Sequence, residues 1–228
     1  MLSNLFPGIC VLCRRRSRRT IDLCPSCERA FTCNDQACHV CGAPLAASGG
    51  VRVCGRCVAT PPPWMRTLAP YTYAQPLTGV IEGLKSGNGL RQARILGALL
   101  SASAKAEYAA TELPEALIPV PLTRRRLRQR GFNQAALLAR STARRLGLPS
   151  LSGHLVRIRN TPPQRSLPRN ARLSNVRTAF AVKRPINYRR VALVDDVSTT
   201  GATAHAASTA LLAGGAEEVH LWVAAKAV

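Results

Sequence analysis

Acidic residues, aromatic residues and long apolar runs are all scarce in this chain. The sequence has 11 Asp and Glu residues against 32 Lys and Arg residues, which gives a formal net charge of +21. Aromatic residues make up 4% of the chain, so few rings are available for nucleic-acid bases to stack on. No apolar stretch approaches the roughly 20 residues that span a membrane, and the first residues lack the pattern of a secretion signal. We therefore expect a cytoplasmic protein without membrane insertion.

The residues that are abundant fit a folded protein with an anionic partner. Hydrophobic residues make up 46% of the 228 positions, which is enough to bury a core. Arginine dominates the positive charge, and its planar guanidinium binds two phosphate oxygens at once. A well-solvated surface is one explanation of this excess. The other is attraction to a polyanion.

All nine cysteines lie in the first 57 residues, and eight of them form four C-x-x-C pairs. Two residues between the sulfurs let both thiolates reach one ion from a tight turn, and two such pairs complete a tetrahedral zinc site. Sequential pairing is the simplest arrangement, and a cross-braced pairing stays open. The eight expected zinc ligands are Cys10, Cys13, Cys24, Cys27, Cys38, Cys41, Cys54 and Cys57.

Two such sites leave no open coordination position, so we expect two structural zinc ions in a double-ribbon module over residues 1–60. Disulfides are the alternative, but no secretion signal accompanies them. Redox chemistry would not need four repeated pairs. The ninth cysteine, Cys33, is expected to be a buried spare, and His39 could replace a sulfur only as a lesser alternative.

A proline-rich connector over residues 61–66 separates this module from an aliphatic region over residues 67–228. Strands are expected over 68–73, 116–122, 190–194 and 219–224. Helices are expected over 77–85, 91–106, 133–147 and 202–213, with Asn133 and Gly147 as caps. Alternating helices and aliphatic strands predict a parallel α/β sheet with helices on both faces. Ligands of such sheets bind at the carboxyl ends of the strands.

The stretch V-A-L-V-D-D-V-S-T-T-G-A-T at 191–203 carries the clearest chemical pattern. The turn from strand into helix points backbone N–H groups and hydroxyls at one spot, which suits a phosphate monoester. Asp195 and Asp196 would repel phosphate, so they are expected to accept hydrogen bonds from a vicinal diol and to hold Mg²⁺ through water. Phosphate and diol together describe a ribose 5-phosphate. The plainer alternative is a turn whose acids cap the following loop.

This stretch resembles the phosphoribosyl-pyrophosphate (PRPP) signature of type I phosphoribosyltransferases. The resemblance implies that Asp195 and Asp196 take the ribose hydroxyls. It also implies a 5-phosphate loop made of Ser198, Thr199, Thr200, Gly201, Ala202 and Thr203. In purine-salvage members an acid stands where this chain has Thr199, and a threonine cannot move a base's proton near neutral pH. Salvage of 6-oxopurines is therefore not expected.

Further motifs are similar to those of the ComF family, which is linked to competence and DNA uptake and often carries a zinc ribbon before a transferase-like domain. They are I-P-V-P-L, R-G-F-N-Q-A, R-N-T-P-P-Q-x-S-L and A-R-x-x-N-V-x-x-A-F. The resemblance implies a pyrophosphate loop at Pro121, Leu122, Thr123 and Arg124. It also implies a flexible loop with Arg159, Thr161, Gln164 and Arg172. Candidate DNA contacts are Arg14, Arg15, Arg16, Arg126, Arg128 and Arg130, for which solvated surface is the alternative.

The hypothesis that accounts for most of these features is a ComF-like protein that binds PRPP with Mg²⁺ and works with single-stranded or incoming DNA. Its protein partners would be a competence helicase or other DNA-processing proteins. Its activity would be phosphoribosyl transfer to an acceptor that the sequence does not name, with no catalytic base identified. One alternative is a transferase of nucleotide synthesis or salvage without a DNA role. The other is a non-catalytic, PRPP-sensing nucleic-acid-binding protein.

Overall fold

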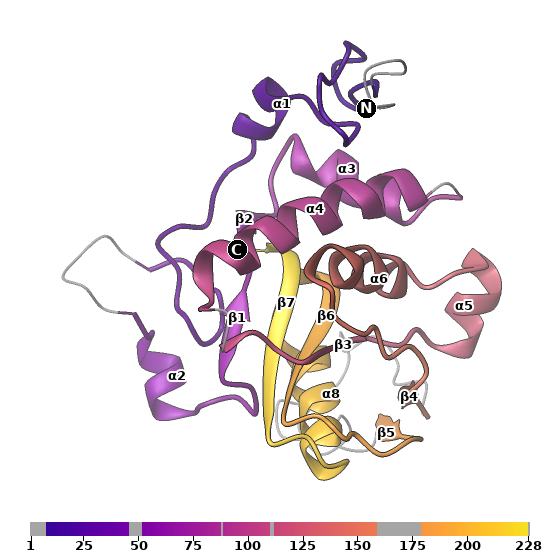
Figure 1. Ribbon diagram of the computed structural model, residues 1–228. Coiled ribbons are helices and arrows are strands. Elements are labelled where there is room, and N and C mark those ends of the chain that lie inside the picture. The colour runs from indigo at the N-terminus through magenta and orange to yellow at the C-terminus, as the bar shows by residue number, and fades with distance from the viewer. Residues whose placement is uncertain (1–7, 46–51, 88, 110–111, 159–178, 228) are drawn as a thin grey trace.

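The computed structural model describes residues 8–45, 52–87, 89–109, 112–158 and 179–227, and its centre is a parallel sheet (Figure 1). The strand order is β1-β7-β6-β3, where the four strands are Arg66–Leu68, Glu218–Lys226, Arg190–Ser198 and Ala116–Pro119. A short strand β2 (Tyr71–Thr72) also pairs with β7. β1 and β2 are separated at Pro70, which has no N–H to donate to the ladder. The last strand of the chain thus lies between the first strands and β6.

Both faces of the sheet are covered, as the aliphatic strands predict. Ala192 and Val194 of β6 point into one hydrophobic cluster, and Val191 and Leu193 point into the other. This alternation follows from the period of two along a strand. A strand buried on both faces reads as a continuous apolar run, which is why V-A-L-V carries no polar residue.

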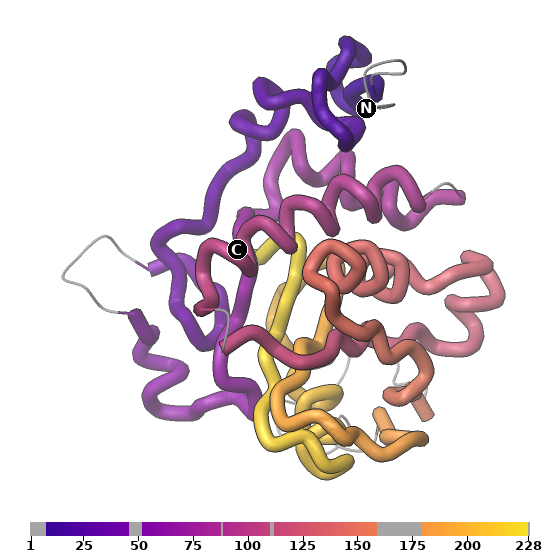
Figure 2. Tube along the Cα trace, in the orientation of Figure 1, coloured from indigo at the N-terminus to yellow at the C-terminus, as the bar shows by residue number. Residues whose placement is uncertain are grey.

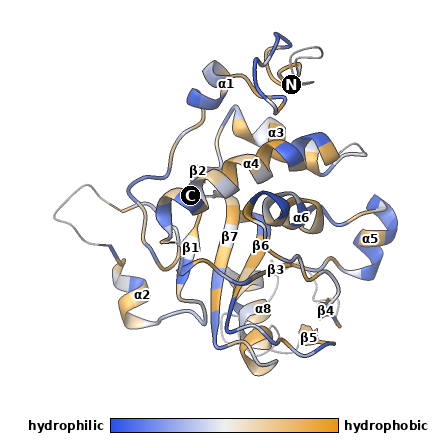
Figure 3. Cartoon of the chain, in the orientation of Figure 1, coloured by the Kyte–Doolittle hydropathy of each residue, from blue (hydrophilic) through white to orange (hydrophobic). Residues whose placement is uncertain are grey.

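The helices divide between the two faces (Figure 1). One face is covered by α3 (Leu77–Leu84), α4 (Gly89–Glu107) and α6 (Gln134–Leu146). The other is covered by α8 (Ala202–Ala213) and by a small antiparallel pair, β4 (Leu155–Arg157) with β5 (Phe180–Val182). Helix α5 (Arg124–Arg130) has no buried residue and is almost wholly hydrophilic in Figure 3.

Several predicted boundaries are confirmed at their capping residues. The Asn133 side chain accepts the Ala135 N–H at 3.1 Å, and Gly147 ends α6 at φ +72°. Several predicted strand boundaries are wrong. The expected strand 116–122 ends at Pro119, and the expected strand 68–73 is divided into β1 and β2. Strand β6 does not stop at Val194 but continues to Ser198, because β7 runs alongside it and pairs as far as Lys226. Asp195 and Asp196 therefore lie within the strand.

The cysteine-rich segment packs directly on the sheet and on α3 and α4. Ile21, Leu23 and Phe31 belong to the same hydrophobic cluster as the buried faces of α3 and α4. The chain then runs down the edge of the sheet to α2 (Gly55–Ala59), as Figure 2 shows. On the way Cys33 pairs antiparallel with Tyr71 of β2. Hydrophobic contacts and backbone pairing thus both attach the segment to the rest of the fold.

Cys33 is exposed, so the prediction of a buried spare is wrong. Cys33 lines a cavity of about 500 Å³ between the second zinc ribbon and α4, and His39, Arg66 and Glu107 line the same cavity. Backbone pairing with Tyr71 at the edge of the sheet holds Cys33 in place. None of the helices in the described ranges is long and apolar enough to cross a membrane.

The shared cluster predicts that the ribbons and the sheet unfold together. Leu23→Ala removes a fully buried side chain, so we expect a loss of about 2–5 kcal/mol in the free energy of unfolding. Circular dichroism during denaturant unfolding should record one transition at lower denaturant concentration. Ile9→Ala, at a residue of the same segment that is 51% exposed, is the control and should change little. Two separate transitions would show instead that residues 1–60 and 67–228 fold independently.

Candidate functional site

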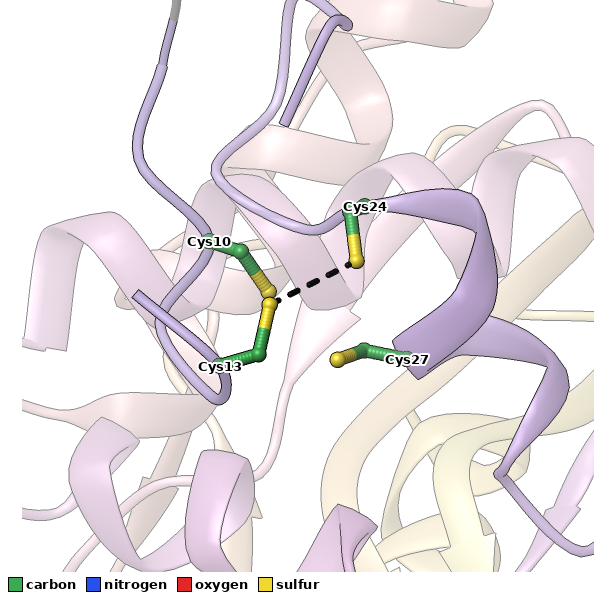
Figure 4. A group of neighbouring side chains, drawn as sticks. All are labelled: Cys10, Cys13, Cys24 and Cys27. Atoms are coloured by element: carbon green, nitrogen blue, oxygen red, sulfur yellow. Dashed lines mark hydrogen bonds between the residues drawn. The ribbon is translucent and has the colours of Figure 1, made fainter. Parts of the chain in front are cut away.

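Two groups of four cysteines converge at the positions that the sequence predicts. One is Cys10, Cys13, Cys24 and Cys27, whose side chains point toward a common centre in Figure 4; the other is Cys38, Cys41, Cys54 and Cys57. In each group all the Sγ atoms lie within 4.8 Å of one another. The Cys13–Cys24 and Cys41–Cys54 sulfur distances are 3.8 and 3.7 Å, close to the edge of about 3.8 Å in a tetrahedral site with four sulfur ligands. The pairing is sequential, and a cross-braced arrangement is excluded.

Backbone hydrogen bonds favour the thiolate form of one cysteine in each group. Burial alone would raise the pKa of Cys10, but hydrogen bonds from the backbone at Cys13, Cys24 and Leu12 outweigh it and lower the pKa to about 6. The same balance lowers the pKa of Cys38 to about 7. Thiolates are the form that binds zinc. His39 stays outside the second group, with Nε2 3.5 Å from Arg52, so the two sets of four cysteines fit two structural zinc ions without it.

The acid pair lies near the carboxyl end of β6. Asp195 Oδ1 accepts the N–H of Asp196 at 2.9 Å, and Asp195 is partly exposed. Asp196 is buried, and its Oδ2 lies 2.8 Å from Nζ of Lys85, the residue that ends α3. Within the described chain, Asp196 Oδ2 makes no well-aligned hydrogen bond. A buried carboxylate oxygen with an ion partner but no hydrogen bond is open to a hydroxyl or to a metal-bound water.

The two carboxyl groups have opposite pKa shifts. Burial raises the pKa of Asp195 well above its usual range, and the charge of Asp196 raises it further. Burial also opposes ionisation of Asp196, but its side-chain hydrogen bond with Asp195 and the Lys85 ammonium outweigh this and lower its pKa. Two adjacent carboxyl groups with one nearby cation cannot both ionise at low cost. The arrangement therefore favours ionisation of Asp196 over ionisation of Asp195.

A loop joins the acid pair to α8. Gly201 is the N-cap of α8 with φ +79°, a left-handed conformation that favours glycine. The residues of this loop line a small cavity of about 60 Å³ together with Asp195. The cavity therefore lies at the positive end of a twelve-residue helix. We call residues 198–203 the phosphate loop.

A larger cavity of about 720 Å³ adjoins the phosphate loop, and Asp195 and Thr203 line both cavities. Its walls come from the end of α3, from the segment after β3, from α5 and from β4. The cationic and amide side chains that line it are Lys85, Arg126, Arg130, Arg157, Gln129 and Gln134. The acid pair therefore lies at the base of a cavity whose other side chains are mostly cationic or amide.

Of the four predicted pyrophosphate-loop residues, two line the large cavity and two form the start of α5. Pro121 and Leu122 line the cavity. Thr123 instead caps α5 by accepting the Arg126 N–H at 3.2 Å, and Arg124 is exposed at the start of that helix. Arg126 and Arg130, named from the sequence as DNA contacts, line the cavity. Arg128 is exposed on α5, and Arg14, Arg15 and Arg16 are exposed in the first ribbon.

Sequence reasoning did not name Lys85, Gln129 or Gln134 as site residues, although all three line the cavity and Gln134 belongs to the R-G-F-N-Q-A motif. Arg157 lies at the start of the segment expected to close over the ligand, and burial and the nearby Arg126 lower its pKa. The predicted flexible-loop residues Arg159, Thr161, Gln164 and Arg172 lie outside the described residues. The strands β4 and β5 flank them, and β4 supplies Arg157 to the cavity.

The fold and the cysteine groups define a class of protein: a double zinc ribbon placed before a parallel α/β sheet with helices on both faces. The double zinc ribbon domain family matches residues 1–58. The chain is 36% identical to the DNA utilization protein YhgH of Escherichia coli K12 over 219 residues, which are 95% of this chain and 96% of that protein. It is 34% identical to competence protein F of Haemophilus influenzae over 99% of this chain and 100% of that protein.

The chain belongs to the ComF family. Among solved structures it is similar to the glutamine PRPP amidotransferase of Bacillus subtilis, with a TM-score of 0.41, 23% identity and coverage of 60% of this chain and 27% of the other. It is also similar to the adenine phosphoribosyltransferase of Leishmania tarentolae, with a TM-score of 0.37, 19% identity and coverage of 63% and 58%. Likeness at this level concerns the fold and carries no detail of function.

The raised pKa of Asp195 predicts a pH-dependent effect of Asp195→Asn. A pKa that is higher in the folded state means that the carboxyl favours folding at low pH and loses that contribution as the pH rises through the folded pKa. A pKa difference of one between the folded and unfolded states corresponds to about 1.4 kcal/mol. Asparagine mimics the protonated acid, so the variant should be more stable than the unmodified chain at pH 8. The difference should shrink at pH 5. Denaturant unfolding at both pH values measures it, and an equal difference at each would contradict the assignment.

Proposed function

We propose that this protein binds PRPP with Mg²⁺ at the carboxyl end of β6 and acts with single-stranded DNA in DNA uptake or utilisation. The observation that carries the proposal is the junction of the phosphate loop, the acid pair and the large cationic cavity, with Asp195 and Thr203 common to both cavities. The family relationship supports the DNA context, because relatives over nearly the whole chain are named for DNA utilization and competence.

The phosphate loop suits the 5-phosphate of the ligand. Its backbone turns at Gly201 into α8, so N–H groups face the small cavity at the positive end of the helix. The acid pair next to it suits the ribose hydroxyls, because Asp196 Oδ2 has no well-aligned hydrogen bond among the described residues. Both carboxylates would hold Mg²⁺ through water, and the ion would supply positive charge for the diphosphate.

The far side of the cavity suits the pyrophosphate. Arg126 and Arg130 of α5 and Arg157 of β4 face the same space, and Arg130 donates to Gln134 at 2.6 Å. Planar guanidinium groups bind phosphate oxygens in pairs. Lys85 contributes a further cation, which pairs with Asp196. In the presence of Mg²⁺ that ammonium becomes free to turn toward an anionic oxygen.

The DNA part of the proposal rests on exposed arginines outside the cavity. Arg14, Arg15 and Arg16 lie on the rigid first ribbon, and Arg124, Arg125 and Arg128 lie on the exposed face of α5. With 4% aromatic residues, stacking on bases is limited, so contact with the DNA backbone would dominate. This favours a DNA role over a transferase that serves only nucleotide synthesis or salvage.

The ligand site is tested by isothermal titration calorimetry with PRPP, with and without Mg²⁺, on the zinc-loaded protein. Asp195→Asn combined with Asp196→Asn should weaken binding by at least about a hundredfold, because two charge-assisted hydrogen bonds are lost. Zinc content should stay the same.

The matched control for this titration is Glu217→Gln with Glu218→Gln, an adjacent acid pair at the opposite end of the neighbouring strand β7. This control should bind PRPP as the unmodified chain does. Failure of the unmodified protein to bind PRPP would rule out the proposed ligand.

The DNA contact is tested by fluorescence anisotropy with a labelled single-stranded oligonucleotide at several salt concentrations. Affinity should fall steeply with salt. Replacing Arg14, Arg15 and Arg16 with Gln should reduce the slope of log K against log salt by about 0.7 for each phosphate that is no longer neutralised. Lys183, Arg184 and Arg189, exposed on the connection before β6, are the control set. Affinity that is independent of salt would contradict an electrostatic contact.

A further inference from the structure

Trp64 connects the second zinc ribbon to the rest of the fold. It lies within the proline-rich connector and is 7% exposed. Its Nε1–H donates to the carbonyl oxygen of Val40 at 2.6 Å. Val40 lies between Cys38 and Cys41 in the C-x-x-C turn that supplies two zinc ligands. The same carbonyl accepts the hydroxyl of Thr67 at 2.6 Å, so this turn is held by two side chains at once.

The other end of the Trp64 ring lies against the phosphate loop. A Cβ atom added to Gly201 would stand 3.3 Å from Cη2 of Trp64 and 3.8 Å from Cζ2. The indole therefore packs directly beneath the residue that turns the loop into α8 at φ +79°. The ring thus fills the space into which a side chain at position 201 would extend. Because interiors are packed at high density, a ring in this position limits the conformations that the loop can adopt.

A second support holds the opposite part of the same loop. The Nζ of Lys226, a buried residue at the end of β7, donates to the carbonyl oxygen of Thr199. The N–H of Ala227 donates to the carbonyl of Ser198 at 2.9 Å. The loop thus has one support from the sheet and another from Trp64. Loss of either one should loosen the loop without unfolding the protein.

We propose that Trp64 is a positioning residue that couples zinc occupancy of the second ribbon to the conformation of the phosphate loop. Zinc fixes the Cys38–Cys41 turn, the turn fixes the Val40 carbonyl, and the carbonyl orients the indole under Gly201. The consequence for phosphate affinity rests on the function proposed above. Coupling of this kind is reciprocal, so a bound phosphate ligand also stabilises zinc in the second ribbon.

The first zinc ribbon can be compared with the second, because it has no such contact with Trp64 among the hydrogen bonds described above. Cys10, with Cys24 and Cys27, packs in the hydrophobic cluster of α3 and α4, whereas Trp64 belongs to the cluster of α8 on the other face of the sheet. Loss of zinc from the first group therefore does not act on the phosphate loop through Trp64. The two zinc ions of one module have different consequences for the ligand site.

The test is hydrogen–deuterium exchange over residues 198–206, measured by mass spectrometry on the zinc-loaded full chain. Trp64→Phe keeps a ring but loses the N–H donor, so exchange in this segment should become about five- to tenfold faster, as expected for one missing hydrogen bond. The matched control is Trp222→Phe, which removes the other indole of the chain, whose Nε1 donates to Tyr108 on the opposite face. Unchanged exchange in Trp64→Phe would overturn the proposal.

A second comparison uses zinc itself. Cys38→Ser with Cys41→Ser should accelerate exchange over residues 198–206, whereas Cys10→Ser with Cys13→Ser should leave it near that of the unmodified chain. Equal acceleration in both variants would overturn specific coupling through Trp64. This readout needs no ligand. If the unmodified chain fails to bind PRPP, the proposed function falls, and the exchange comparison still decides the role of Trp64.

Discussion

The parallel pairing of β6 with β7 is the constraint on which the rest of this structure depends. The last strand supplies backbone partners to β6 as far as Ser198 and to β1 and β2 on its other edge. This register places Asp195 opposite Val223 and keeps both acids inside the ladder. The loop that follows is therefore anchored by the sheet before it enters α8. A strand that ended at Val194 would leave the two carboxyl groups on a free turn.

Burial within that strand gives the two acids different chemistry. Asp196 lies near the end of α3 and pairs with Lys85, while Asp195 also lines the small cavity of the phosphate loop. The two pKa values move in opposite directions because one cation serves two carboxyl groups. Identical neighbours in the sequence thus differ in how readily they ionise.

The zinc ribbons are integrated with the transferase-like sheet. The first contributes Leu23 and Phe31 to the cluster beneath α3 and α4, and the second holds Trp64 through the Val40 carbonyl. A small cysteine-rich module has little core of its own, so it gains stability by packing on a larger one. The same contacts bring a metal-bound turn close to the phosphate loop. The ribbons therefore connect to the loop at residues 198–203 through Trp64, and they also carry exposed arginines.

Local spacing was sufficient to identify both zinc groups, because the two cysteines of each pair lie within one turn. It also predicted a ligand site from the acid pair and residues 198–203, and Asp195 lines one small cavity with that loop. The caps at Asn133 and Gly147 were predictable for the same reason. Lys85, Arg157 and Trp64 could not be assigned their contacts from the sequence, since each depends on how a distant element docks on the sheet. The sequence alone therefore predicted the two zinc groups and the parallel α/β class. Tertiary structure alone decided which cations face the acids and which zinc group supports the loop, because those contacts arise only when residues far apart in the chain pack together.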